Sequence, residues 1–182
     1  VVLSDGQTTG RGAKDISMMV VRRVISLLAE GVRDGAAARA AADFLYAERN
    51  GKVSATLNIL SADLQTGTLV ITRNSTTPVF VTRGDRIECL LGESSAIGTM
   101  RNSRPAISEI PLDGETTVVM YTDGLLHAGD RYGQKFDICT MLESMLEDQD
   151  PLAQEIAESL LNQAISLDQG RPNDDMSIVV LQ

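Results

Sequence analysis

The feature that most constrains the fold is a change of hydrophobic period, from helical to strand-like and back. Residues 52–91 contain four short runs rich in β-branched residues, broken by Gly, Pro, Asp and Asn. Such runs are typical of consecutive antiparallel strands. Residues 106–112 and 116–123 read as two more strands, separated by the turn Asp113-Gly114. The middle of the chain is therefore predicted to be β-sheet.

Helical periodicity flanks this run on both sides. Apolar residues recur at spacings of three and four in four segments: 13–30, 37–49, 138–146 and 152–165. Asp150-Pro151 is expected to cap the last of these helices. Short apolar strands are predicted at residues 1–5 and 176–182, the two ends of the chain. This order predicts an α+β fold with antiparallel sheet and outer helices, in one domain spanning residues 1–182.

Composition excludes several classes of function. The formal net charge is −9 and the sixteen basic residues are scattered, so nucleic acid and anionic membrane are not expected partners. No apolar run approaches the roughly 20 residues that a membrane-spanning helix needs. Two cysteines are too few for a disulfide framework, which favours a reducing cytoplasm. The chain begins with Val rather than Met, and we expect it to lack an N-terminal strand segment.

Acidic residues stand at the ends of three apolar strands. Asp5-Gly6 and Asp123-Gly124 each follow such a strand, and Asp174-Asp175 precede the last one. If these ends meet, the carboxylates repel one another, and a hard divalent cation would offset that repulsion. The alternative is that each acid only caps a turn, because Asp-Gly is a common turn dipeptide.

The composition also limits the kind of metal. One histidine and two unclustered cysteines argue against a zinc site of the usual type. A metal here would be held by oxygen, which points to magnesium or manganese and less readily to calcium.

Five motifs, in order and spacing, resemble those of the metal-dependent protein serine/threonine phosphatases of type 2C. The likeness covers nearly the whole chain and is to the bacterial subfamily of stage II sporulation protein E and the sigma-factor regulatory phosphatases. The motifs are "VVLSDGQTTGRGA", "RNSTTPVFVTRGDRIECL", "SSAIGTM", "PLDGETTVVMYTDGLLHA" and "NDDMSIVVL". The resemblance implies a four-layer α-β-β-α sandwich, with two mainly antiparallel sheets flanked by helix pairs.

The resemblance also implies a ligand set. Asp5, Asp123 and Asp174 would hold two manganese or magnesium ions, Gly6 would contribute its backbone carbonyl, and Asp175 would lie in a second shell. The family usually has a further acidic ligand upstream of its first motif, and this sequence begins after that point. Thr8 stands where many relatives have glycine, and Ala96 replaces the usual proline.

The function implied is hydrolysis of phosphoserine or phosphothreonine by a metal-activated water, without a covalent phosphoenzyme. The expected substrate is a bacterial regulatory protein such as a phosphorylated anti-sigma-factor antagonist. His127 is a candidate general acid, or a polar residue of a surface loop. The segment 127–137 is a candidate flap over the site.

Two other functions compete with hydrolysis. One is a catalytically degenerate phosphatase fold that acts as a binding or scaffold module. The other is an aspartyl-phosphate protein, either a receiver or a haloacid-dehalogenase-like enzyme, whose strands also end on Asp. These last folds alternate strand and helix around a parallel sheet, which the run of consecutive strands disfavours.

Overall fold

The structure is a computed structural model that describes residues 1–7, 11–84, 86–92, 94–148 and 151–182. It divides into two compact units, and each contains one four-stranded sheet. Unit 1 comprises Val1–Thr76 and Gly92–Leu112, and unit 2 comprises Thr77–Leu91 and Asp113–Gln182.

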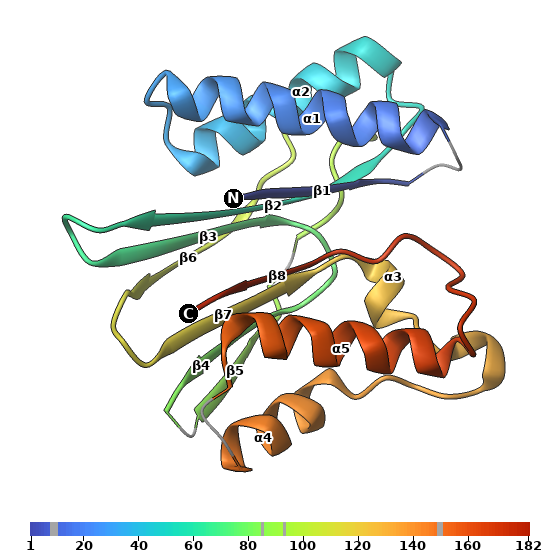
Figure 1. Ribbon diagram of the computed structural model, residues 1–182. Coiled ribbons are helices and arrows are strands. Elements are labelled where there is room, and N and C mark those ends of the chain that lie inside the picture. The colour runs from blue at the N-terminus through green and yellow to red at the C-terminus, as the bar shows by residue number, and fades with distance from the viewer. Residues whose placement is uncertain (8–10, 85, 93, 149–150) are drawn as a thin grey trace. The chain divides into compact units, whose positions relative to one another are not determined.

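Unit 1 combines a sheet with two helices that lie along one of its faces (Figure 1). The strands are ordered β1-β2-β3-β6 and every neighbouring pair is antiparallel. The elements are β1 (Val2–Gly6), β2 (Ala55–Asp63), β3 (Thr68–Asn74), β6 (Ala106–Pro111), α1 (Arg11–Ala29) and α2 (Asp34–Arg49).

The core of unit 1 lies between these helices and the sheet. From α1 it takes Ile16, Val20 and Val24, spaced four residues apart so that they share one helix face. α2 contributes mainly alanines, whose small side chains allow close helix packing, and β2 contributes Ala55, Leu57 and Ile59 from alternate positions.

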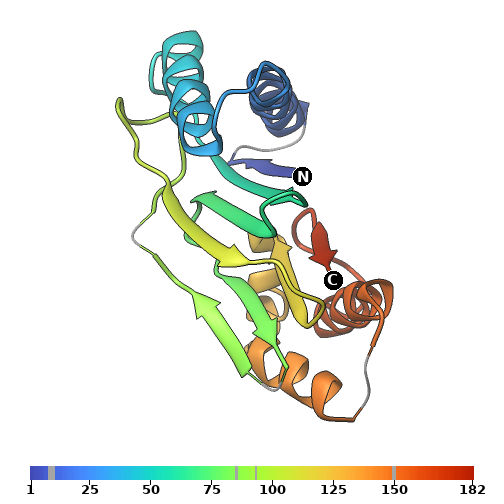
Figure 2. The ribbon, with the colours of Figure 1, turned by 90° about the vertical axis from the view of Figure 1, so that its left-hand side faces the viewer.

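Unit 2 holds the second sheet, ordered β5-β4-β7-β8 and again antiparallel throughout. Figure 2 shows α4 and α5 beside this sheet. The elements are β4 (Val79–Arg83), β5 (Arg86–Leu90), β7 (Thr116–Tyr121), β8 (Ile178–Leu181), α3 (Asp123–Leu126), the 3₁₀ turn η1 (Asp130–Tyr132), α4 (Ile138–Asp148) and α5 (Ala153–Leu167). The buried residues of α4 and α5 pack against Phe80, Val119 and Tyr121.

The predicted α+β class is confirmed, with two antiparallel sheets and flanking helices. The parallel sheet required by the aspartyl-phosphate folds is absent from the described strands, because every pairing among them is antiparallel. The sequence did not predict that β4 and β5 belong to the second sheet and not to the sheet of β2 and β3. It also did not predict that a helical turn, α3, begins at Asp123. Two residues singled out in the sequence lie outside the described residues: Asp150, the expected helix cap, and Thr8, which stands where many relatives have glycine.

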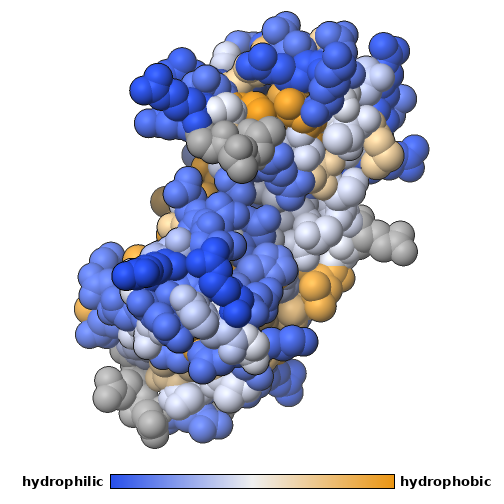
Figure 3. Space-filling view, turned by 90° about the vertical axis from the view of Figure 1, so that its right-hand side faces the viewer, coloured by the Kyte–Doolittle hydropathy of each residue, from blue (hydrophilic) through white to orange (hydrophobic). Residues whose placement is uncertain are grey.

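Hydrophilic residues predominate on the face shown in Figure 3, and hydrophobic ones occupy small separate areas. In the described part of the chain, no helix combines the length and the apolar character that crossing a bilayer requires.

Adjacent positions on α1 test the packing of unit 1. Val24 is fully buried, whereas Ile25 is 52% exposed. We expect Val24→Ala to lower the free energy of unfolding by about 2 kcal/mol, because it leaves a cavity. Ile25→Ala, the matched control, should change it by less than about 0.5 kcal/mol. Urea unfolding measures both, and equal losses would contradict the assigned burial.

Candidate metal site

Asp123 stands where β7 ends and α3 begins. All of β7 is buried, and Thr122 in extended conformation is the N-cap of the short helix that follows. The carboxylate is partly buried, and its Oδ1 has no hydrogen-bond partner among the described residues. A buried carboxylate oxygen without a donor is costly, and a bound cation is one way to satisfy it. The unpartnered Oδ1 of Asp123 is therefore the feature of the structure that best supports a metal ligand.

The segment that carries Asp174 lies directly against Gly124, the residue after Asp123. A Cβ added at Gly124 would overlap the backbone carbonyl of Asp175 and lie 3.4 Å from Cβ of Asp174. Glycine is therefore needed at position 124 for this close approach. The structure brings together two of the predicted site positions, Asp123 and Asp174, within unit 2.

The hydroxyl of Thr122 holds this segment in place. It accepts a hydrogen bond from the Ser177 N–H at 3.0 Å and donates one to the Asp175 carbonyl at 3.2 Å. The Thr122 N–H donates to the Ser177 carbonyl at 3.0 Å, which extends the pairing of β7 and β8 by one step. Sequence reasoning missed this role of Thr122, because its hydroxyl bonds to residues more than fifty positions away and makes no side-chain cap bond to α3.

Asp174 and Asp175 are both exposed, so a cation from solvent can reach them. The Asp175 N–H donates to Oδ1 of Asp174 at 2.8 Å. That bond orients the Asp174 carboxylate.

Asp5 and Gly6 end β1 in unit 1. The Asp5 N–H donates to Oγ1 of Thr56 at 3.1 Å, and the Gly6 N–H donates to Oγ of Ser17 in α1 at 2.8 Å. Ser17 Oγ in turn donates to the Ala13 carbonyl at 3.0 Å. A Cβ at Gly6 would overlap that same carbonyl oxygen. The predicted Gly6 position is thus fixed against the first turn of α1, a link through Ser17 that the sequence did not reveal.

His127 is the C-cap of α3, and its side chain is 65% exposed. Its Nδ1 lies 2.9 Å from Oδ2 of Asp130, and its backbone N–H donates to the Asp123 carbonyl at 2.9 Å. The exposure agrees with a surface polar residue, and a role as general acid or in a second shell stays a prediction. The segment 127–137 contains η1, and its role as a flap also stays a prediction.

The predicted ligands belong to different units, Asp5 and Gly6 to unit 1 and Asp123 and Asp174 to unit 2. Among the described residues, no group of three or more His, Cys, Asp or Glu side chains is arranged to hold a metal ion. Assigning all four residues to one centre therefore stays a prediction. Their donor atoms, carboxylate and carbonyl oxygens, fit magnesium or manganese.

Tyr121 precedes this site in the chain and is buried in the core of unit 2. Its ring stacks on Phe80 with centroids 6.2 Å apart, and burial raises the pKa of its phenol well above the ordinary value. The raised pKa favours the protonated phenol, so we assign Tyr121 no role as a base.

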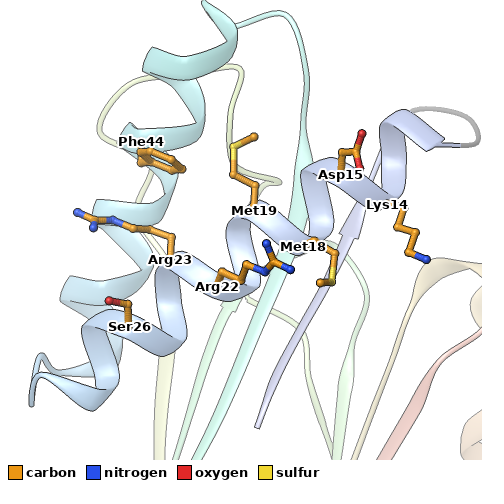
Figure 4. Close-up of a pocket in the computed structure, with 8 residues that line it drawn as sticks. All are labelled: Lys14, Asp15, Met18, Met19, Arg22, Arg23, Ser26 and Phe44. Carbon is orange, nitrogen blue, oxygen red and sulfur yellow. The ribbon is translucent and has the colours of Figure 1, made fainter.

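An open pocket of about 700 Å³ lies on α1 in unit 1 (Figure 4). Its walls include the side chains of Met19 and Arg23 beside Phe44 of α2, with the Arg23 guanidinium 5.6 Å from the ring centroid. Among the described residues that line the pocket, Asp15 is the single carboxylate. The described lining therefore shows no paired carboxylates of the kind that a metal centre needs.

The comparison with known families decides the relationship. The family model of Stage II sporulation protein E (SpoIIE) matches residues 1–182, the whole chain.

The chain belongs to this family.

A curated SpoIIE-family relative, Stage II sporulation protein E of Priestia megaterium, is 23% identical over 181 residues. The match covers 99% of the chain but 30% of the relative, so the chain spans under a third of that protein.

Two solved structures show the same fold. The first contains the PP2C phosphatase domain and a regulatory fragment of SpoIIE from Bacillus subtilis. It matches with a TM-score of 0.81 at 23% identity, covering 98% of this chain and 52% of that one. The second is the catalytic domain of the serine/threonine phosphatase PstP in complex with two manganese ions. It matches at 0.75 and 16% identity, covering 98% and 85%. The fold is that of PP2C phosphatase domains, and the predicted family resemblance is confirmed.

Two glycines of unit 2 test the close approach at the site. Gly124→Ala should lower the free energy of unfolding by about 2 kcal/mol, because the new Cβ would overlap the Asp175 carbonyl. Gly114→Ala is the matched control, since nothing lies within 4 Å of a Cβ added there. Chemical denaturation measures both variants. A neutral Gly124→Ala would mean that the Asp174 segment does not lie against α3.

Proposed function

We propose that this protein hydrolyses phosphoserine or phosphothreonine on a bacterial regulatory protein, using two manganese or magnesium ions held by Asp5, Gly6, Asp123 and Asp174. The observation that carries the proposal is the buried Oδ1 of Asp123, which has no donor among the described residues and lies on a segment packed against Asp174. Membership of the SpoIIE family and the manganese ions bound by PstP support it.

The chain's own residues supply rigidity and charge. Asp123 directly follows the fully buried strand β7 and Thr122. The Thr122 hydroxyl fixes the Asp174 segment by bonding to the backbone of Asp175 and Ser177. The turn at Gly6 is fixed through Ser17. Divalent cations bound there would lower the pKa of water and offset charge on the phosphoryl oxygens. Rigid carboxylates suit that role, because geometry set before binding need not be reorganised during the reaction.

The substrate and setting form the finer part of the proposal. A phosphorylated anti-sigma-factor antagonist in the cytoplasm is the substrate we propose, because the family match and the sequence motifs point to this branch of phosphatases. His127 remains available on the exposed side of α3 to donate a proton to the leaving oxygen.

Hydrolysis of a phosphothreonine peptide by the purified protein, titrated with Mn²⁺, tests this function. We expect turnover that requires the metal and that falls at least about 100-fold in Asp123→Asn, since a ligand to the cation is lost. Asp113→Asn is the matched control: this exposed acid of unit 2 accepts the Glu115 N–H at 3.2 Å in the turn before β7. That variant should retain full activity.

The same experiment separates the competing function. If the wild-type protein binds a phosphorylated regulator but releases no phosphate at saturating Mn²⁺, the domain is a binding module and the hydrolase proposal is wrong. Equal activity in Asp123→Asn and wild type would refute the assigned ligand.

A further inference from the structure

Asp168 is a buried carboxylate of unit 2 to which the proposed chemistry assigns no role. It is 3% exposed and forms the C-cap of α5, six positions before Asp174. Its Oδ1 accepts a hydrogen bond from the Gly129 N–H at 2.9 Å, and its Oδ2 accepts one from the Asn173 N–H at 3.3 Å. Both oxygens of one side chain are therefore used to hold backbone from elsewhere in the unit.

The two segments that Asp168 holds are those that flank the candidate ligands. Gly129 lies just after α3, the helical turn that Asp123 begins, and Asn173 immediately precedes Asp174. A side-chain bond from Arg131 to Oδ1 of Asn173 links the same segments at the exposed surface. One buried acid thus connects the chain after Asp123 to the chain before Asp174.

Both hydrogen bonds need a carboxylate. Ionised acids accept stronger hydrogen bonds than neutral groups, and a buried carboxylate is tolerated only when such bonds satisfy it. Asparagine at position 168 could accept from only one of the two N–H groups, because its amide nitrogen would face the other donor. Gly129 also has a positive φ of 84°, and a Cβ there would lie 3.2 Å from Cβ of Leu167. The turn at Gly129 therefore packs closely against the C-terminal end of α5.

The arrangement complements that of Thr122. Thr122 holds the chain on the C-terminal side of Asp174, through Asp175 and Ser177, and Asp168 holds it on the N-terminal side, through Asn173. Asp174 itself is exposed and sits between these two attachments. With either attachment lost, the Asp174 carboxylate would have greater freedom relative to Asp123.

We propose that Asp168 is a positioning residue, which fixes the backbone of Asp174 relative to that of Asp123 and thereby sets the affinity of the site for a divalent cation. The inference rests on the proposed function, because it takes Asp123 and Asp174 as ligands. Asp168 itself does not contact the cation. Residues that orient metal ligands in this way typically change metal affinity by about 10–100-fold when replaced.

Calorimetric titration of the purified protein with Mn²⁺ alone tests this role directly. We expect Asp168→Asn to raise the Kd for Mn²⁺ by about 10–100-fold, while turnover at saturating Mn²⁺ stays within about threefold of wild type. Asp113→Asn is again the matched control, because it loses a carboxylate that accepts a backbone N–H but that holds neither segment of the site. Its Kd for Mn²⁺ should be unchanged, because the hydrogen bonds of Asp113 stay within the turn that leads into β7.

The outcomes separate the two proposals. If Asp168→Asn lowers the unfolding midpoint but leaves the Kd within twofold of wild type, Asp168 has only a structural role and this inference is wrong. If the wild-type protein binds no Mn²⁺, the proposed function fails and the inference fails with it.

A measurement on the wild-type protein covers the case in which Asp168→Asn does not fold. Amide hydrogen exchange of Gly129 and Asn173, followed by NMR, should slow for both residues together when diamagnetic Mg²⁺ is added, because the bound cation would restrain the segments that these amides anchor. Unchanged exchange at both amides under saturating Mg²⁺ would overturn the inference.

Discussion

The geometry of the candidate site in unit 2 depends on the hydrogen bonds of the Thr122 hydroxyl. This hydroxyl accepts the Ser177 N–H and donates to the Asp175 carbonyl, so it fixes the last residues before β8 to the end of β7. The fully buried β7 leaves that end little freedom. Because Asp123 follows Thr122 and Asp174 precedes Asp175, this hydroxyl restrains the two acids relative to each other from the C-terminal side of Asp174, and Asp168 does so from the N-terminal side.

Unit 1 uses the same principle with a serine. Ser17 of α1 accepts the Gly6 N–H and donates to the Ala13 carbonyl, and Gly6 has no room for a side chain. In both units a small hydroxyl residue fixes the backbone beside a predicted ligand, and in unit 2 the Asp168 carboxylate adds a second attachment. A hydroxyl can hold the backbone without adding charge next to the carboxylates that the proposed function assigns to cations.

Much of the fold followed from the sequence because its elements differ in period. The four-residue spacing of Ile16, Val20 and Val24 predicted α1, and the β-branched runs predicted the strands. The sequence did not predict which sheet each strand belongs to, because the residues of a run such as 78–85 contain no signal that distinguishes one sheet from the other. Helix α3 was missed because four residues are too few to show a helical period.

The candidate ligands were predicted partly from their residue type at strand ends and partly from family motifs. Their supports were not predictable in the same way. Ser17, Thr122 and Asp168 act through backbone atoms distant in sequence, and no local pattern records such a contact. Asp168 in particular lies in a segment that looks like an ordinary helix end followed by a turn, so only the fold reveals that its carboxylate holds Gly129 and Asn173.

The central claim is that Asp123 binds a metal ion. A crystal structure of the protein grown with Mn²⁺, with anomalous difference density recorded for manganese, tests it most directly. The account predicts a manganese peak in direct contact with the Asp123 carboxylate, within about 2.5 Å of an oxygen. Manganese bound elsewhere, with Asp123 contacting none of it, would contradict the account.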